Sequence, residues 1–361
     1  MEKFQLKNIC RPKQWKTLTG KNLVPDGKYP VYGANGIIGY YNDYNHENET
    51  LMIGCRGTCG ALNISQPFSY INGNAMALDD LVDDIDIRYL YYALMGRGFQ
   101  DVISGAVQPQ IIRADLEKME VWIGNKKEQK EIVDVFSKLD AVLSHRKREI
   151  QYLDDLIKAR FVEMFESQAW ERVRAGTIML NMRNGVSPSN IGTYPAKVLT
   201  LSAITQGGFN PDSWKDGMFD VDPPLEKRVT ASDFYMCRGN GNKKLVGVGV
   251  YSKEDRYDLI FPDTAIAATI DLHRICLPYL FYAWQQPFVR KQIEAGARTT
   301  NGTYKINQGV VSNIELALPP LKLQKQFAAF VAAIDKSKAT VQKALDETQL
   351  LFDSLMQQYF G

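Results

Sequence analysis

One stretch of the sequence occurs twice, and this repeat limits what the chain can fold into more than any other feature. The first copy covers residues 129–165 and the second covers residues 324–360, so a constant offset of 195 superimposes them. The offset matches Gln129 with Gln324 at the start of the two copies. Because an internal repeat of this kind is typical of a tandem architecture, we expect two similar halves.

Both copies have the hydrophobic periodicity of a long helix. Apolar residues recur at alternating steps of three and four, as in the seam of a coiled coil, and neither copy contains Pro or Gly. The residues predicted to form this seam are Ile132, Phe136, Leu139, Leu143, Ile150, Leu153, Ile157, Phe161, Phe327, Val331, Ile334, Val341, Leu345, Phe352 and Leu355. A helix of about 36 residues is roughly 54 Å long and cannot bury such a stripe alone. Each helix could pack on a globular core, but two equally long stripes favour pairing with each other.

Turn signals and short β-like runs divide the rest of the chain into two globular units. We expect these units at residues 1–124 and 167–319, each followed by a long helix, at 125–166 and 320–361. Within them the sequence predicts aromatic helices near Asp86 to Phe99 and Tyr279 to Trp284. It also predicts strands that include residues 199–201, 233–237 and 245–250. The predicted fold class is α+β, with two mixed α/β units in pseudo-twofold tandem separated by two long antiparallel helices that form a coiled coil.

The composition indicates the cellular environment of the chain more clearly than its function. The net charge of +2 over 361 residues is only a weak indication of nucleic acid. No apolar run approaches the ~18 residues that span a bilayer, and the charged N-terminus lacks a signal core, so we expect no membrane contact. The five cysteines are an odd number and are scattered, which fits free thiols in a reducing cytoplasm.

Several fragments have partial catalytic or ligand-binding signatures, and each fails on spacing or context. Cys55 and Cys59 stand four apart, but no further Cys or His lies near them in sequence to complete a zinc site. The glycine pairs complete neither a dinucleotide fingerprint nor a phosphate loop. Asp222 begins a DPPL tetrapeptide similar to that of amino-methyltransferases, but Leu225 stands where an aromatic residue should stack on a flipped base. We therefore expect no enzyme activity, no metal site and no cofactor in this chain.

Polar and cationic loop residues recur on turns in both halves, and these residue types contact the bases and phosphates of nucleic acid. Any one of them is by default a solvated loop residue, so the recurrence carries the prediction. The candidate DNA-binding residues are Asn35, Tyr40, Tyr41, Asn42, Arg56, Thr58, Gln108, Arg183, Asn184, Arg238, Asn240, Asn242, Lys243, Lys244, Arg298, Thr299 and Thr300. Two loop sets of different composition on a shared skeleton indicate one task performed on two different targets.

The order of these landmarks resembles a known family from end to end. The segments that carry the resemblance are YPVYGANGIIGY at 29–40, CRGTCG at 55–60, YLYYAL at 89–94 and LPPLKLQKQ at 318–326. They are similar to patterns of the DNA-specificity subunit of type I restriction–modification systems. The first half departs from the family pattern, because IGNKKEQ at 123–129 replaces the prolines that precede the spacer helix.

The resemblance implies separate roles for the globular units, the long helices and the partner subunits. Each globular unit would be a target-recognition domain that reads one half of a split site in double-stranded DNA, and the helices would set the spacing. The chain would be non-catalytic and would hold no cofactor itself. Two methyltransferase subunits would dock on it and restriction subunits would join them, bringing S-adenosylmethionine, ATP and Mg. A coiled-coil adaptor that binds only proteins is the alternative from another class.

Overall fold

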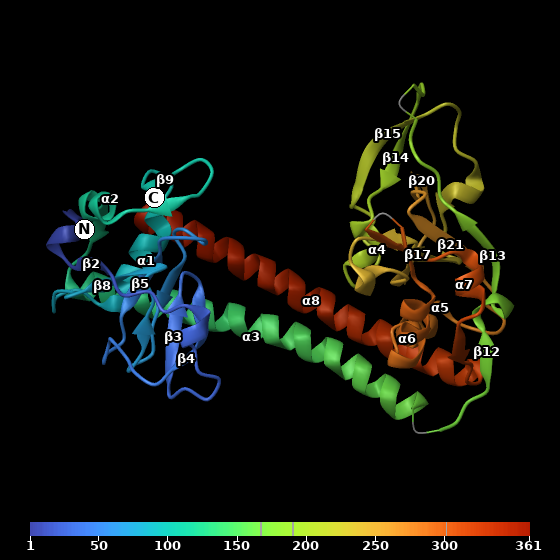
Figure 1. Ribbon diagram of the computed structural model, residues 1–361, viewed down its shortest axis with the longest axis horizontal. Coiled ribbons are helices and arrows are strands. Elements are labelled where there is room, and N and C mark those ends of the chain that lie inside the picture. The colour runs from blue at the N-terminus through green and yellow to red at the C-terminus, as the bar shows by residue number, and fades with distance from the viewer. Residues whose placement is uncertain (167, 190, 301) are drawn as a thin grey trace. The chain divides into compact units, whose positions relative to one another are not determined.

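The chain folds as two compact units, each of which combines strands with parts of two long helices. The computed structural model describes residues 1–166, 168–189, 191–300 and 302–361. Unit 1 comprises residues 1–149 and 341–361, and unit 2 comprises residues 150–340. The long helices are α3 (Lys126–Phe165) and α8 (Leu321–Phe360) (Figure 1). The prediction of two mixed α/β units in tandem, with long helices, is confirmed.

Unit 1 is built on two small sheets, with two strand pairs and two short helices around them. The four-stranded sheet has the order β2 (Arg11–Gln14), β8 (Ala75–Asp79), β5 (Leu51–Gly54), β6 (Leu62–Ile64). The three-stranded sheet has the order β4 (Gly36–Tyr41), β3 (Tyr29–Gly33), β7 (Tyr70–Ile71). The remaining elements are the pair β1 (Glu2–Gln5) and β11 (Glu120–Ile123), the hairpin β9 (Ile103–Ser104) and β10 (Gln110–Ile111), and helices α1 (Ile87–Arg97) and α2 (Arg113–Lys118).

Unit 2 contains three sheets and one isolated strand pair. Its four-stranded sheets have the orders β13 (Met179–Asn184), β21 (Ala265–Ile270), β17 (Asp233–Cys237), β19 (Gly249–Tyr251) and β15 (Trp214–Phe219), β14 (Tyr194–Leu199), β20 (Arg256–Ile260), β16 (Arg228–Val229). The third sheet has the order β18 (Gly239–Asn240), β23 (Thr303–Lys305), β22 (Arg298–Thr300), and β12 (Arg172–Arg174) pairs with β24 (Glu315–Ala317). Its short helices are α4 (Ser202–Thr205), α5 (Leu277–Trp284), α6 (Pro287–Gly296) and α7 (Gln308–Ser312).

The strand predicted at residues 245–250 is wrong for residues 245–248. Residues Lys243–Leu245 form a 3₁₀ turn, and strand β19 begins only at Gly249. Gly247 lies between them with φ of +68°, the left-handed region that favours glycine. Its backbone carbonyl accepts a hydrogen bond from Trp284 Nε1 at 2.8 Å, so the chain turns here to meet α5.

A buried glutamine attaches α3 to unit 1. The Gln129 side chain is 3% exposed. Its Oε1 accepts a hydrogen bond from the Asp86 backbone N at 2.8 Å, just before α1, while its Nε2 donates to the carbonyls of Asp84 and Gly124 at 3.0 and 2.9 Å. The first turns of α3 are therefore fixed both to the start of α1 and to the end of β11.

The same hydrogen-bonded attachment recurs in unit 2, at the repeat-related glutamine of α8. Gln324, the counterpart in α8, is 0% exposed. Its Oε1 accepts from the Cys276 backbone N at 2.9 Å, just before α5, and its Nε2 donates to Arg274 O at 3.1 Å and to Pro319 O at 2.8 Å. Each long helix thus starts on the same three-bond attachment within its own unit.

Aromatic side chains join segments of both long helices to the globular part of unit 1. The ring of Phe136 on α3 lies 5.1 Å from that of Phe352 on α8 and 5.0 Å from that of Tyr92 on α1. Phe360, at the end of α8, lies 5.8 Å from Tyr89 on α1. In unit 1, helix pairing and packing on a globular core therefore occur together.

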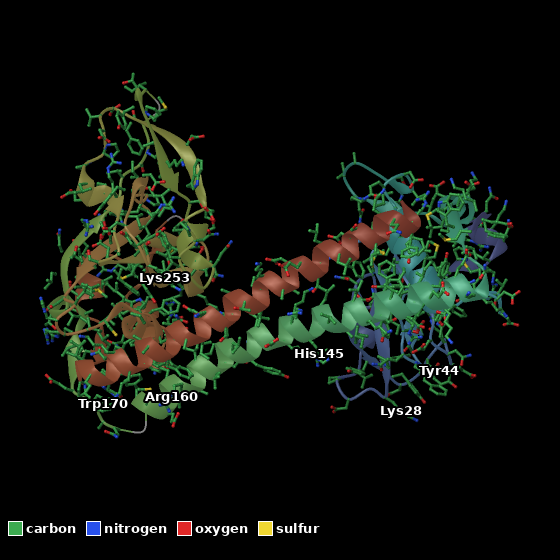
Figure 2. The ribbon with its side chains drawn as sticks, turned by 180° about the vertical axis from the view of Figure 1, so that it is seen from behind. Lys28, Tyr44, His145, Arg160, Trp170 and Lys253 are labelled. Atoms are coloured by element: carbon green, nitrogen blue, oxygen red, sulfur yellow. The ribbon has the colours of Figure 1, made fainter. Side chains whose placement is uncertain are left out.

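Unit 2 repeats this arrangement with the roles of the two helices exchanged. Phe161 near the end of α3 lies 5.5 Å from Phe327 near the start of α8, and Phe165 lies 4.8 Å from Tyr279 on α5. The Trp170 indole, just after α3, donates to Phe165 O at 2.8 Å (Figure 2).

All fifteen residues predicted for the seam are buried or half-buried. None of the described helices is long and apolar enough to cross a membrane.

Replacement of Gln324 tests whether its buried hydrogen bonds attach α8 to unit 2. We expect Gln324→Leu to lower the free energy of unfolding by about 2–4 kcal/mol, because three backbone groups lose their partner. Urea denaturation followed by circular dichroism measures the change. Gln326→Leu, an exposed position two residues further along α8, is the matched control and should change stability by less than about 0.5 kcal/mol. Equal losses in the two variants would contradict this role.

Candidate nucleic-acid interface

Four of the candidates in unit 1 lie on three loops that meet. Asn35 is exposed on the β3–β4 turn, Arg56 and Thr58 are exposed after β5, and Gln108 is exposed in the β9–β10 hairpin. A Cβ added at Gly54 would lie 2.5 Å from Ala34 O, so the first two loops touch.

The hairpin β9–β10 joins these loops through backbone and thiol contacts. Ile111 N donates to Cys55 O at 3.0 Å, and Cys59 Sγ donates to Pro109 O at 3.1 Å. Arg56 also forms an isolated β-bridge with Gln110. Asn35, Arg56, Thr58 and Gln108 therefore belong to one surface of unit 1.

The other three unit 1 candidates lie away from that surface. Tyr40, Tyr41 and Asn42 are at the far end of the β3–β4 hairpin, about 17 Å from Asn35 at ~3.3 Å per residue. The Tyr41 ring packs on Tyr70 at 5.9 Å, whereas Tyr40 is 44% exposed. The structure thus divides the predicted set of this unit into two groups.

In unit 2 the small sheet β18–β23–β22 brings several candidates together. Asn240 pairs with Tyr304, which in turn pairs with Thr299, while Arg298 pairs with Lys305. The backbone is described at Thr300, but its side chain lies outside the described residues.

Three further candidates form the turn that follows β18. The Asn242 side chain accepts a hydrogen bond from Lys244 N at 3.0 Å, and Lys243 Nζ lies 5.9 Å from the centre of the Tyr304 ring. Asn242, Lys243 and Lys244 are all exposed, so this turn presents two cations beside the small sheet.

A hollow of about 610 Å³ opens beside this sheet. Its polar lining consists of Arg238, Arg298, Lys305, Gln292, Asn307 and Asn313, without a carboxylate. Sequence reasoning missed Lys305, although its position seven residues after Arg298 across a short hairpin is a usable signal. We call Arg238, Arg298 and Lys305 the cationic trio.

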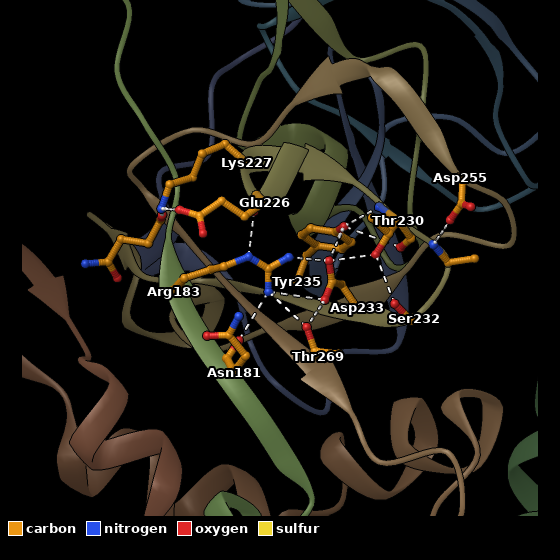
Figure 3. A network of polar contacts seen from close by, with 12 residues as sticks. Asn181, Arg183, Glu226, Lys227, Thr230, Ser232, Asp233, Tyr235, Asp255 and Thr269 are labelled. Atoms are coloured by element: carbon orange, nitrogen blue, oxygen red, sulfur yellow. Dashed lines mark hydrogen bonds and ion pairs between the residues drawn. The ribbon is translucent and has the colours of Figure 1, made fainter. Parts of the chain in front are cut away.

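In contrast, the Arg183 side chain forms an ion pair and hydrogen bonds within unit 2 (Figure 3). Its side chain is 11% exposed and pairs with that of Asp233, 1% exposed, through Nη2···Oδ2 at 2.5 Å and Nη1···Oδ1 at 3.2 Å. Its Nε donates to Glu226 O at 2.6 Å, and Nη1 donates to the Thr269 hydroxyl at 3.1 Å. These contacts give Arg183 a structural role between β13, β17 and β21.

Hydroxyl groups complete the same network. Tyr235 OH and Thr230 Oγ1 donate to Asp233 Oδ2 at 3.2 and 2.7 Å. Burial, together with the nearby Asp233 charge, raises the pKa of the Tyr235 hydroxyl, so it remains a donor. The neighbouring candidate Asn184 is half-buried, and its backbone carbonyl accepts from Lys227 Nζ at 2.9 Å.

Two buried thiols and the histidine on α3 are further groups that the structure locates. Burial raises the pKa of Cys10 to about 12 and that of Cys237 to about 11, so both thiols are protonated near neutral pH. His145 is exposed on α3, with Arg148 Nη2 3.2 Å from its Nδ1 (Figure 2). In the part of the chain that the structure describes, no group of three His, Cys, Asp or Glu residues could hold a metal ion.

Comparison with known proteins points to one kind of protein. Residues 1–152 match the model of the type I restriction modification DNA specificity domain. The Type I restriction enzyme EcoprrI specificity subunit of Escherichia coli is 25% identical over 115 residues, which are 32% of this chain and 28% of that protein. The match thus spans less than a third of the curated relative's length.

Two solved structures resemble the chain over nearly its whole length. A type I restriction–modification S subunit from M. genitalium has a TM-score of 0.65 at 18% identity and covers 100% of this chain and 96% of its own. A structure from work on complex assembly of the type I R-M system has a TM-score of 0.55 at 12% identity, covering 99% and 95%. These likenesses support the fold, and the resemblance inferred from the sequence is confirmed.

Removal of the buried carboxylate tests the structural role of Arg183. We expect Asp233→Leu to lower the free energy of unfolding by about 3–5 kcal/mol, because the guanidinium loses its partner while it stays buried. Asp258→Leu removes the partner of Arg256 at a more exposed pair and should cost less than about 1 kcal/mol.

A double variant separates the lost ion pair from the lost carboxylate. Arg183→Met/Asp233→Leu should recover part of the stability that Asp233→Leu loses, as measured by urea denaturation. A double variant less stable than Asp233→Leu would show that the ion pair does not explain the network.

Proposed function

We propose that this chain is the DNA-binding specificity subunit of a type I restriction–modification complex, because residues 1–152 match the model of the type I restriction modification DNA specificity domain. The observation that carries the proposal is the domain match together with the repeat. Both units hold a loop surface that combines cationic, amide and hydroxyl groups next to the same skeleton. Such groups are the usual contacts to base edges and phosphates.

Each unit is proposed to read one half of a bipartite site in double-stranded DNA. The loop surface of unit 1 offers Asn35, Gln108 and the single cation Arg56. The corresponding region of unit 2 offers Arg238, Asn240 and Arg298. Amides pair best with adenine, and arginine can contact either guanine or a phosphate, so the different amide positions fit different half-sites.

The long helices are proposed to pair as an antiparallel coiled coil that sets the distance between the half-sites. In support, α3 and α8 each contain 40 residues, and helix-to-helix contacts occur in both units. A helix of this length reaches roughly 60 Å, enough to span more than one ~34 Å turn of duplex.

The chain is proposed to act as a non-catalytic scaffold in the cytoplasm. Two methyltransferase subunits would dock on it and restriction subunits would join them. S-adenosylmethionine, ATP and Mg would belong to those partners. The repeat supports two copies of the same partner, because each unit offers the same skeleton once.

Loop substitutions in one unit test the bipartite reading. Asn35→Ala/Gln108→Ala in unit 1 should relax specificity in one half-site only, at a cost of about 1–3 kcal/mol per lost base contact. Asn240→Ala in unit 2 should affect only the other half. Competition binding of the complex with its methyltransferase subunits, using duplexes randomised in one half, measures both.

Two outcomes of this competition experiment would contradict the proposal. Loss of discrimination in both halves from a change in one unit would refute separate reading. Absence of any sequence preference in the wild-type complex would favour a protein-only adaptor.

Shortening α3 tests the role of the helices. Deletion of four residues around Ser144 removes about one turn, or roughly 6 Å. The preferred gap between half-sites should then shrink, while the half-site sequences stay the same. Methylation of a duplex library with variable gaps gives the readout; an unchanged gap would show that the helices do not set the spacing.

A further inference from the structure

The tripeptide Cys-Arg-Gly occurs in both units, as residues 55–57 and 237–239, and the two copies are built alike. Arg56 N donates to the carbonyl of Asn74, the residue before β8, at 3.3 Å. Arg238 N donates to the carbonyl of Thr264, the residue before β21, at 2.8 Å. Each arginine thus follows a central strand and is held by the strand beside it.

The same short hairpin adjoins both turns. In unit 1, Ile111 N from the β9–β10 hairpin donates to Cys55 O at 3.0 Å. In unit 2, Ile306 N, just after the β22–β23 hairpin, donates to Arg238 O at 2.9 Å. The repeat offset of 195 matches Ile111 with Ile306, while the Cys-Arg-Gly turns lie 182 residues apart. Each unit thus joins a Cys-Arg-Gly turn to a matching hairpin, and turn and hairpin together are called the duplicated element.

Among the described residues, no carboxylate pairs with the arginines of this element. Arg183, Arg256 and Arg290 of unit 2 each pair with a carboxylate. Within the described residues, neither Arg56 nor Arg238 takes part in such a pair, and the side chain of Arg238 donates to the backbone carbonyl of Asp263 at 3.1 Å.

The hairpins of the two units differ in charge at matching places. In unit 1, Gln110 faces Ser104 across the hairpin, and in unit 2, Lys305 faces Arg298. Like charges directly opposite in an antiparallel pair destabilise the folded state. Together with Arg238 they line one hollow whose described lining contains no carboxylate, an arrangement that an external anion would stabilise.

We propose that this duplicated element contacts the DNA phosphate backbone, and that the cationic trio makes unit 2 the stronger phosphate-binding unit. The proposal rests on the proposed function, since the anion is the phosphodiester of duplex DNA. Arg56 supplies one phosphate contact in unit 1, whereas Arg238, Arg298 and Lys305 supply three in unit 2. Unit 2 therefore dominates the sequence-independent part of binding.

The salt dependence of DNA binding measures the number of phosphate contacts. For the full chain and a 30-bp duplex of random sequence, log K falls with log salt in proportion to the phosphates neutralised, with a slope near −0.9 per contact. Arg238→Gln, Arg298→Gln, Lys305→Gln and Arg56→Gln should each make the slope shallower by about 1 and weaken binding about 5-fold at 0.15 M salt. The triple variant of the trio should make it shallower by about 3.

Matched variants separate phosphate contact from structural damage. Arg238→Lys keeps the charge and should keep the slope, while Lys336→Gln on α8 removes an exposed cation outside the element and should leave it unchanged. Lys305→Gln should be at least as stable to heat as the wild type, because it relieves the like-charge pair. A residue with a merely structural role would show the opposite: lower stability and an unchanged slope.

The possible results distinguish this inference from the function it rests on. Wild-type protein that does not bind duplex DNA at 50 mM salt would overturn the proposed function. Wild-type binding with a slope that the trio variants leave unaltered would overturn the phosphate contact alone. If a variant lost affinity for one DNA sequence only, the replaced arginine would be a base contact. That result would likewise overturn the phosphate contact.

Discussion

A helix with an apolar stripe along 40 residues cannot be stable in water unless something covers that stripe, and this requirement governs the structure. The chain meets it by carrying the stripe twice. In each unit, part of one copy meets part of the other, and the aromatic residues at the helix ends extend into the globular core. Phe136 and Phe161 show this double use, since each contacts a long-helix phenylalanine and a tyrosine of a short helix.

The ends of the helices are fixed by chemistry that is equally duplicated. Gln129 and Gln324 are buried amides whose hydrogen-bonding groups are used on the backbone. A buried amide of this kind is stable only with its partners in place, so it defines how a helix leaves its unit. This attachment uses backbone groups, so it does not depend on the loop side chains, and the two units present different side chains on one skeleton.

Much of the fold was predictable because its signals are local or repeated. The period of the stripe, the absence of Pro and Gly and the matching glutamines identified the long helices and the tandem order. The Arg183 network was not predictable, because its partners Asp233 and Thr269 are 50 and 86 residues away in sequence. Loop residues such as Tyr40 and Asn35 looked equivalent in the sequence, and only the hairpin geometry separates them. Lys305 was missed because its importance depends on the strand register that places it opposite Arg298.

Two differently equipped units are proposed to read two parts of one DNA site at a separation set by the helices. The most direct measurement is the map of adenines methylated by the complex of this chain with its methyltransferase subunits, obtained by sequencing modified genomic DNA. We expect a single motif made of two specified half-sites with an unread gap of constant length. One uninterrupted motif, or half-sites with no constant separation, would contradict it.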